Sequence, residues 1–69
     1  MKTEMSKKYK RLLDRIDELS ALNKSIARLA FYINENNPEG EGHNAMKRQL
    51  SAMIEYRVEL QRRIENGWY

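Results

Sequence analysis

Several residue types that stabilise or punctuate small domains are rare in this sequence. It has no cysteine, one proline, three glycines and one histidine among 69 residues. The lack of cysteine excludes a disulfide framework and thiolate metal sites. No apolar run approaches the roughly 20 residues of a membrane span, and the lysine-rich start from Met1 to Arg11 has no apolar signal region behind it. We therefore expect one small, all-α domain over residues 1–69, in the cytosol and without a membrane partner.

Residues 3–34 are predicted to form one long helix. Thr3 can act as its N-cap, and nothing breaks the pattern before the Asn34–Gly42 stretch, which holds the proline and two glycines. Asn23 is the one polar member of the apolar register, so its amide is expected to fix the pairing at a cost in stability. The register alternates steps of four and three, as in a coiled-coil seam: Met5, Tyr9, Leu12, Ile16, Leu19, Asn23, Ile26, Ala30 and Ile33.

A second helix is predicted over residues 44–66, after a loop over residues 35–43. Asn44 is its expected N-cap, and Asn66-Gly67 has the composition of a helix stop. The aromatic tail Trp68-Tyr69 is expected to fold back onto the helices or onto a neighbouring subunit. These elements predict an antiparallel two-helix hairpin.

Both predicted helices carry more apolar surface than one neighbour can cover. In the second helix, Ile54 and Val58 form a stripe that is offset from the main one. The main stripe consists of Leu50, Met53, Leu60 and Ile64. Either Tyr56 or Arg57 fills the gap between Met53 and Leu60. In the first helix, three leucines widen the seam: Leu13, Leu22 and Leu29. Because a core in a chain below about 70–80 residues is marginal, we expect the hairpin to assemble into a homo-oligomer.

No residue pattern typical of an enzyme or of a metal site occurs. His43 has Glu39 and Glu41 nearby, but three such residues beside a turn usually stay solvated, so we expect no metal ion there. No serine or threonine has a base at a recognisable spacing, and no glycine-rich phosphate loop is present. The sequence predicts a protein that is not an enzyme and that needs no cofactor.

Positive charge is concentrated in the first half of the chain. The residues through position 33 include eight basic and four acidic side chains, and the remainder includes five and six. The run Lys7-Lys8-Tyr9-Lys10-Arg11 places four cations around one aromatic ring, and Lys24 and Arg28 follow on the same helix. A ring among cations suits a planar group that carries phosphates. The other interpretation is that Tyr9 closes the seam and the lysines are its solvated rim.

The end of the first helix and much of the second resemble a known family. An aromatic-isoleucine pair occurs in Ala30-Phe31-Tyr32-Ile33-Asn34, and a turn with asparagine and proline follows. The second helix then contains Gln49-Leu50, Ala52-Met53, Tyr56, Leu60 and Arg63-Ile64. This ordered set is similar to short phage-encoded helical hairpins, known as nucleotide sponges, that block bacterial CBASS immunity. A related hairpin occurs in sponges that block Thoeris signalling.

The resemblance implies a function and a set of site residues. Sponges of this family sequester cyclic di- and trinucleotide signals in the host cytoplasm, as oligomers that are typically hexamers. It implies that an aromatic ring stacks on a base and that a lysine holds a phosphate, and the matching residues are Tyr9 and Lys24, with Lys8, Lys10 and Arg28 beside them. Arg62 and Arg63 are candidates for a separate trinucleotide site, and otherwise they pair with Glu59 one helical turn earlier.

A second class of function stays open at this point. The chain can instead be a small basic helical module that binds nucleic acid through Lys7 to Arg11, or one that serves as an assembly adaptor. Nucleic-acid binding falls steeply with salt, whereas an enclosed pocket retains its ligand at moderate salt. We expect a cyclic oligonucleotide rather than nucleic acid as the main partner.

Overall fold

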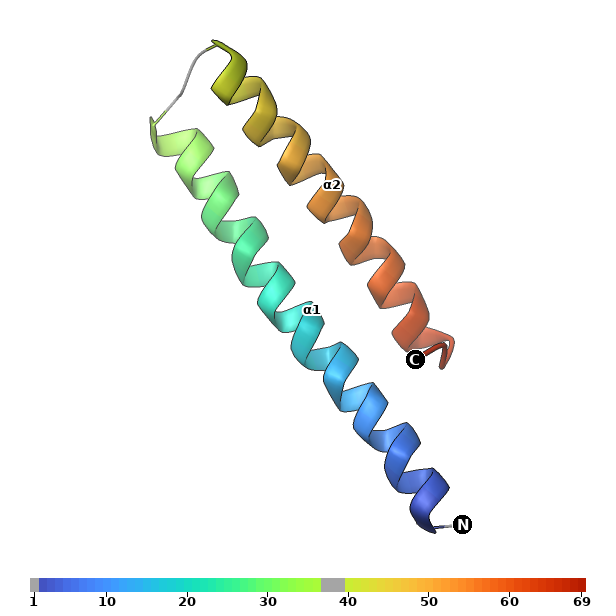
Figure 1. Ribbon diagram of the computed structural model, residues 1–69. Helices are drawn as coiled ribbons and strands as arrows, with labels where there is room; N and C mark the ends of the chain where they lie inside the picture. Colours follow the sequence, from blue (N-terminus) through green and yellow to red (C-terminus); the bar gives the residue numbers. More distant parts are fainter. Residues whose placement is uncertain (1, 37–39) are drawn as a thin grey trace.

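Two α-helices make up most of the described part of the chain. In the computed structural model the described residues are 2–36 and 40–69, with side chains described for 7–35 and 40–69. Helix α1 spans Lys2–Asn36 and helix α2 spans Gly40–Glu65. The helices run antiparallel and side by side, and the C-terminus lies next to α1 well before its N-terminal end (Figure 1). The predicted all-α, two-helix hairpin is confirmed.

Both helices begin earlier than the sequence predicts. Helix α1 begins one residue before Thr3, so the expected N-cap lies inside the helix, with its side chain outside the described residues. Helix α2 begins at Gly40, whose φ of 77° is a value that a residue with a Cβ rarely adopts. The prediction that Asn44 is the N-cap is therefore wrong, because glycine allows the chain to enter the helix four residues earlier. The expected turn residues 37–39 lie outside the described residues.

The face of α1 that packs on α2 is rotated from the predicted seam. Leu22 and Leu29 are half-buried, whereas Ile16 is 44% exposed and Asn23 is exposed. Two registers fit the sequence, because four positions belong to both: Leu12, Leu19, Ile26 and Ile33. Helix α2 covers the register with the larger side chains, since leucine at 22 and 29 buries more apolar surface than asparagine at 23 and alanine at 30. The prediction that Asn23 is buried is therefore wrong for the single hairpin.

The tightest packing lies at two aliphatic side chains, one on each helix. Leu60 is fully buried and Ile26 is 8% exposed. Arg57, rather than Tyr56, fills the gap in the main stripe of α2, since the arginine is half-buried and the tyrosine is exposed. The offset stripe of α2 is exposed in the hairpin, as the sequence predicts: Ile54 and Val58.

The C-terminal end of α2 closes with a Schellman motif. Gly67 has a φ of 72°, and its N–H donates to the carbonyl oxygen of Ile64 at 3.3 Å. The N–H of Trp68 donates to the carbonyl oxygen of Arg63 at 2.7 Å. These two bonds satisfy carbonyl groups that the end of a helix leaves without partners. The predicted helix stop at Asn66-Gly67 is confirmed.

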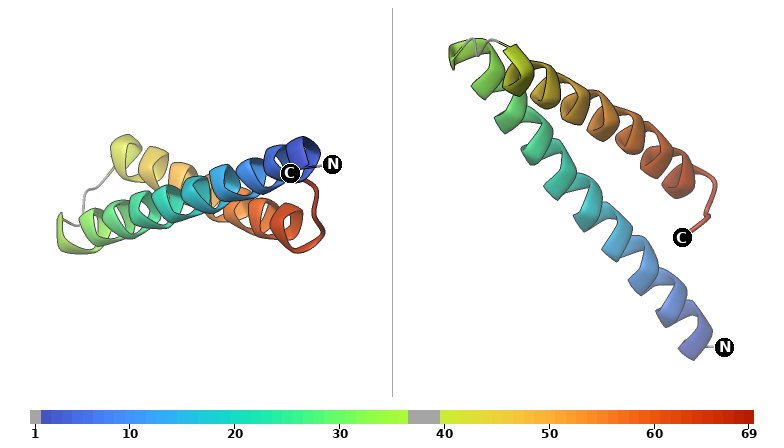
Figure 2. Two further views of the ribbon diagram at one scale, coloured as in Figure 1. Left: turned by 90° about the horizontal axis from the view of Figure 1, so that it is seen from below. Right: turned by 45° about the horizontal axis from the view of Figure 1, so that its top comes forward.

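The hairpin is elongated and exposes much of its surface. Its extents are 56 × 16 × 14 Å and its radius of gyration is 16.1 Å, whereas a compact chain of this length has a radius of about 11 Å. Helix α1 has 35 residues and α2 has 26, so the blue end of α1 continues past α2 (Figure 1). Figure 2 shows that the helices cross rather than lie parallel. Neither helix has, over the residues described, a stretch that is long and apolar enough to cross a membrane.

The aromatic tail packs only in part. Trp68 is 62% exposed, and Tyr69 is half-buried. A pair of helices has no further layer that can cover both rings at this end. The prediction that the tail folds back onto the hairpin is therefore wrong for Trp68, and packing onto a neighbouring subunit stays a prediction.

Candidate functional site

The five residues expected at the ligand site fall into two groups along α1. Tyr9, Lys8 and Lys10 lie on the end of α1 that continues past α2, and all three are exposed. Lys24 and Arg28 lie one turn apart in the second half of the helix, and both are exposed. At 1.5 Å per residue, Tyr9 and Lys24 are roughly 22 Å apart along the helix axis. A single hairpin therefore does not bring the expected stacking ring and the expected phosphate ligand together.

Tyr9 does not act as the last layer of the core in the hairpin. Its side chain is 62% exposed because α2 ends before it reaches this part of α1. Met5, the first position of the predicted seam, has its side chain outside the described residues. The ring of Tyr9 is thus available for another molecule, either a ligand or a second copy of the chain.

The second group lies in a part of the hairpin without carboxylates. Residues 19–34 of α1 and 42–54 of α2 contain four cations and no aspartate or glutamate: Lys24, Arg28, Lys47 and Arg48. The two segments lie side by side at the loop end of the hairpin (Figure 1). Charges of one sign that face no opposite charge raise the local concentration of anions. We refer to these two segments as the carboxylate-free zone.

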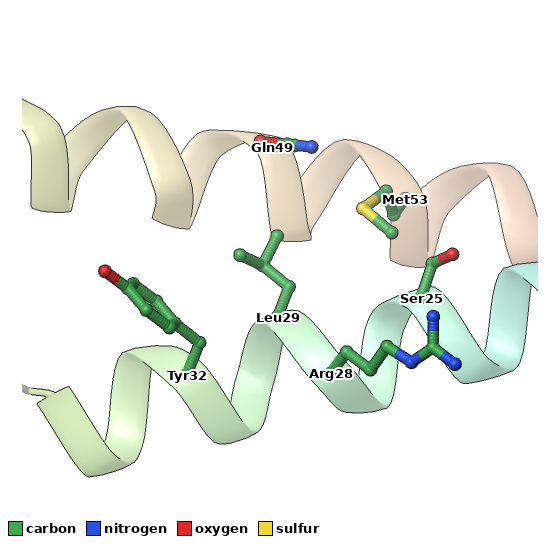
Figure 3. A pocket seen from close by; sticks show the side chains of 6 residues that line it. All are labelled: Ser25, Arg28, Leu29, Tyr32, Gln49 and Met53. Atoms are coloured by element: carbon green, nitrogen blue, oxygen red, sulfur yellow. The ribbon is translucent and has the colours of Figure 1, made fainter.

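An open pocket lies between the helices within this zone. Its volume is about 420 Å³, which falls in the usual range of roughly 300–1,000 Å³ for ligand pockets. Six side chains line it: Ser25, Arg28, Leu29, Tyr32, Gln49 and Met53. In Figure 3, Tyr32 and Leu29 rise from α1 toward α2, and the guanidinium of Arg28 lies along α1 beside Ser25. We call this feature the groove pocket; it combines an apolar floor, an aromatic ring, a cation and an amide.

Sequence reasoning missed Tyr32 and Gln49 as pocket residues. Both belong to the pattern that carries the family resemblance, but neither was expected at a ligand site. A local signal was present, because Lys24, Arg28 and Tyr32 follow one another in steps of four and so share one side of α1. The contribution of Gln49 depends on how α2 lies over α1, which the spacing within one helix does not give.

The opposite flank of the contact between the helices exposes apolar side chains. Arg57 of α2 donates from Nη1 to Oδ1 of Asn23 on α1 at 3.5 Å, and this bond marks the flank. On a helical wheel, six exposed large apolar side chains lie within about 100° of these two residues, on the side away from Glu18 and Tyr56. They are Tyr9, Leu13, Ile16 and Phe31 of α1 and Ile54 and Val58 of α2. We call this surface the uncovered face.

A polar cluster ties the two helices together on the groove side. The hydroxyl of Tyr56 donates to Oε2 of Glu18 at 2.5 Å, and Nε of Arg15 lies 3.1 Å from Oε1 of the same carboxylate. The hydrogen bond to Glu18 raises the pKa of Tyr56 above its ordinary value of 10.0, burial and the negative charge of Glu18 add to this, and the charges of Arg63 and Arg15 oppose it. The cluster holds α2 to α1 and keeps the phenol neutral.

Arg62 and Arg63 lie at the end of α2 that is remote from the carboxylate-free zone. Nη1 of Arg62 lies 3.5 Å from Oε2 of Glu59, as the sequence predicts for a surface ion pair. Arg63 is exposed. A trinucleotide site at these arginines stays a prediction, and within one hairpin it would be separate from the groove pocket.

The residues weighed as metal ligands do not form a cluster in the part of the chain that the structure describes. Over those residues, no group of three or more histidine, aspartate or glutamate side chains is placed to hold a metal ion. Glu39, one of the three residues considered, lies outside the described residues.

Comparisons with known proteins do not assign the chain to a family. No protein-family model, curated protein or solved structure matches it.

Proposed function

We propose that this chain is a non-catalytic sponge that binds cyclic di- or trinucleotide immune signals and keeps them from bacterial anti-phage defence. The observation that carries the proposal is the arrangement of α1. An exposed tyrosine lies between Lys8 and Lys10 at one end, and two cations lie in the carboxylate-free zone at the other. Stacking surface and phosphate ligands are the two requirements for holding a nucleotide without reacting with it. A phage protein of this kind would act in the host cytoplasm.

The proposed sponge is a homo-oligomer, and its uncovered face contacts a second copy. The hairpin exposes 5600 Å², whereas a compact protein of this mass exposes about 4,600 Å². The difference of roughly 1,000 Å² is close to the 800 Å² or so that one partner buries in a standard interface. A second copy of this chain supplies a complementary apolar surface at equal concentration. By the family resemblance we propose six chains.

The proposed assembly would also bring together site residues that lie far apart within one hairpin. A ligand that touches both Tyr9 and Lys24 cannot do so along one helix, because they are roughly 22 Å apart. In the proposed oligomer, Tyr9 of one hairpin stacks on a base while Lys24 of a neighbouring hairpin holds a phosphate. Lys8, Lys10 and Arg28 add positive charge around the ligand.

The test is calorimetric titration of cyclic di- and trinucleotides into the wild type and into Tyr9→Ala and Lys24→Ala. Loss of stacking costs about 1–3 kcal/mol, and loss of a charge-assisted hydrogen bond costs about 1.5–3 kcal/mol. Each change should weaken binding roughly fivefold or more. Lys47→Ala removes the same charge from an exposed position on α2 and serves as the control.

Two further measurements make the result decisive. Analytical ultracentrifugation must show that each variant keeps the mass of the wild type, because Tyr9 also belongs to the uncovered face. The ligand should be recovered intact after the complex is denatured, since binding alone leaves it unchanged. Full affinity in a Tyr9→Ala, Lys24→Ala double variant of unchanged mass would show that the site lies elsewhere. Recovery of cleaved ligand would overturn the proposed non-catalytic function.

A basic nucleic-acid-binding module is the second candidate, and one observation favours it. The end of α1 that continues past α2 presents exposed cations from Lys7 to Arg11 on a helix with no neighbour at that point. Binding of single-stranded or duplex DNA should then strengthen with length and fall steeply between 50 and 200 mM salt. Binding of a small cyclic ligand that changes little over the same range favours the sponge.

A further inference from the structure

We infer that the groove pocket holds one nucleotide unit of the proposed ligand, with its base on Tyr32 and its phosphate at Arg28. This inference rests on the proposed function for the chemical class of the ligand. It differs from that proposal in its residues, because the pocket forms within one hairpin and does not include Tyr9. It adds Tyr32 as a stacking residue and Gln49 as a residue that contacts the base.

The side chains of the pocket follow one another along α1 in an order that matches the parts of a nucleotide. Tyr32 lies toward the loop, and the guanidinium of Arg28 extends from one turn earlier along α1 in the other direction, beside Ser25 (Figure 3). Leu29 lies between them, and Met53 of α2 closes the apolar floor. A ring at one end, an apolar middle and a cation at the other end match base, sugar and phosphate in that order.

Charge around the pocket selects an anion. The positions one helical turn from Arg28 on either side are occupied by Lys24, Ser25, Phe31 and Tyr32, none of which is acidic. The ion pairs among the described side chains are those of Arg15 with Glu18 and of Arg62 with Glu59, and both lie outside the carboxylate-free zone. The guanidinium of Arg28 can therefore make two parallel hydrogen bonds to a phosphate without first leaving a carboxylate.

Gln49 gives the pocket a group that can distinguish bases. It lies on α2, across the pocket from Leu29 (Figure 3). A primary amide offers both a donor and an acceptor, and so it can pair with the edge of a purine. Replacement of the amide should change the preference among bases more than it changes the affinity for the best of them.

The experiment compares three pocket variants with a matched control, using cyclic di-AMP and cyclic GMP-AMP as probes. The pocket variants are Tyr32→Leu, Arg28→Gln and Gln49→Leu. Arg48→Gln is the control, because it makes the same charge change as Arg28→Gln within the carboxylate-free zone but outside the pocket. Affinity is measured by calorimetry, and mass by ultracentrifugation. We expect Tyr32→Leu and Arg28→Gln each to weaken binding about fivefold or more, and the control to stay within about twofold of the wild type.

The outcomes separate this inference from the proposed function. If the wild type binds neither these probes nor any other cyclic nucleotide, both are wrong. If the wild type binds and Tyr9→Ala loses affinity while Tyr32→Leu and Arg28→Gln keep it, the sponge stands and the pocket is not its site. Loss of mass in Tyr32→Leu or Arg28→Gln would show that a second copy of the chain occupies the pocket, which also overturns the inference. A changed ratio between the two probes in Gln49→Leu, at unchanged mass, supports it.

Discussion

The groove pocket and the uncovered face lie on the two flanks of one helix pair, and they differ in what they expose. The groove side has a cavity lined in part by Arg28, and it has the hydrogen bond from Tyr56 to Glu18. The uncovered face has six large apolar side chains and a single bond between the helices, from Arg57 to Asn23. In the proposed sponge, the two flanks of one helix pair would therefore have two different tasks. One flank suits a charged ligand, and the other suits a second copy of the chain.

The largest expected effect comes from charge placed on the uncovered face. The double change Ile54→Glu and Val58→Glu should reduce the sedimenting mass to that of one chain and lower the stability of the fold. Burial of each side chain is worth about 1.5–3 kcal/mol, and buried carboxylates would add a further cost. Ala21→Glu, at an exposed position away from both aliphatic residues, should leave the mass unchanged. A double variant that keeps the mass of the wild type would show that this face makes no contact.

A smaller effect is expected at the polar residue beside that face. Asn23→Leu should raise the stability of the assembly by about 1 kcal/mol, or roughly 4–8 °C in the melting midpoint, while broadening the distribution of masses. The reason is that a leucine gains apolar burial and no longer penalises misaligned pairing. Arg57→Met removes the partner of Asn23 but keeps the amide, so it should not broaden the distribution. A sharp mass distribution in Asn23→Leu would count against a role of this residue in register.

The rotation of α1 shows what the sequence predicts and what it does not. The two helices and the Gly67 stop follow from local patterns, because caps, breakers and apolar steps act over a few residues. Local patterns do not decide whether Asn23 or Leu22 contacts α2, because both residues fit apolar steps of three and four. This contact depends on which residues of α2 face α1, and the register of α1 with the larger side chains is the one that packs there. The same dependence explains why Gln49 was not expected at the pocket: only the crossing of the helices brings it opposite Leu29.

The smallest expected effect lies on the groove side and depends on pH. The raised pKa of Tyr56 means that the fold favours the neutral phenol, so the stability from this group is fully present below pH 10 and is lost as pH rises through the raised value. Tyr56→Phe should remove that alkaline component, which we expect to be about 0.5–1 kcal/mol because solvent screens an exposed pair. Urea unfolding of both proteins between pH 8 and pH 11 measures it. Parallel curves for the two proteins would mean that the bond to Glu18 contributes nothing.

The exposed apolar surface on one flank also affects how fast the proposed oligomer forms. Two helices joined by a short connection make mostly local contacts, and such pairs form within about a millisecond or faster. Association of two copies at micromolar concentration proceeds at roughly 10⁵–10⁷ M⁻¹s⁻¹, which corresponds to about 0.1–10 s per encounter that succeeds. In the proposed assembly, the uncovered face therefore stays exposed until a second copy binds, which takes far longer than folding of the hairpin. The rate at which newly made chains complete the proposed site between Tyr9 and Lys24 would then be set by how fast the protein accumulates.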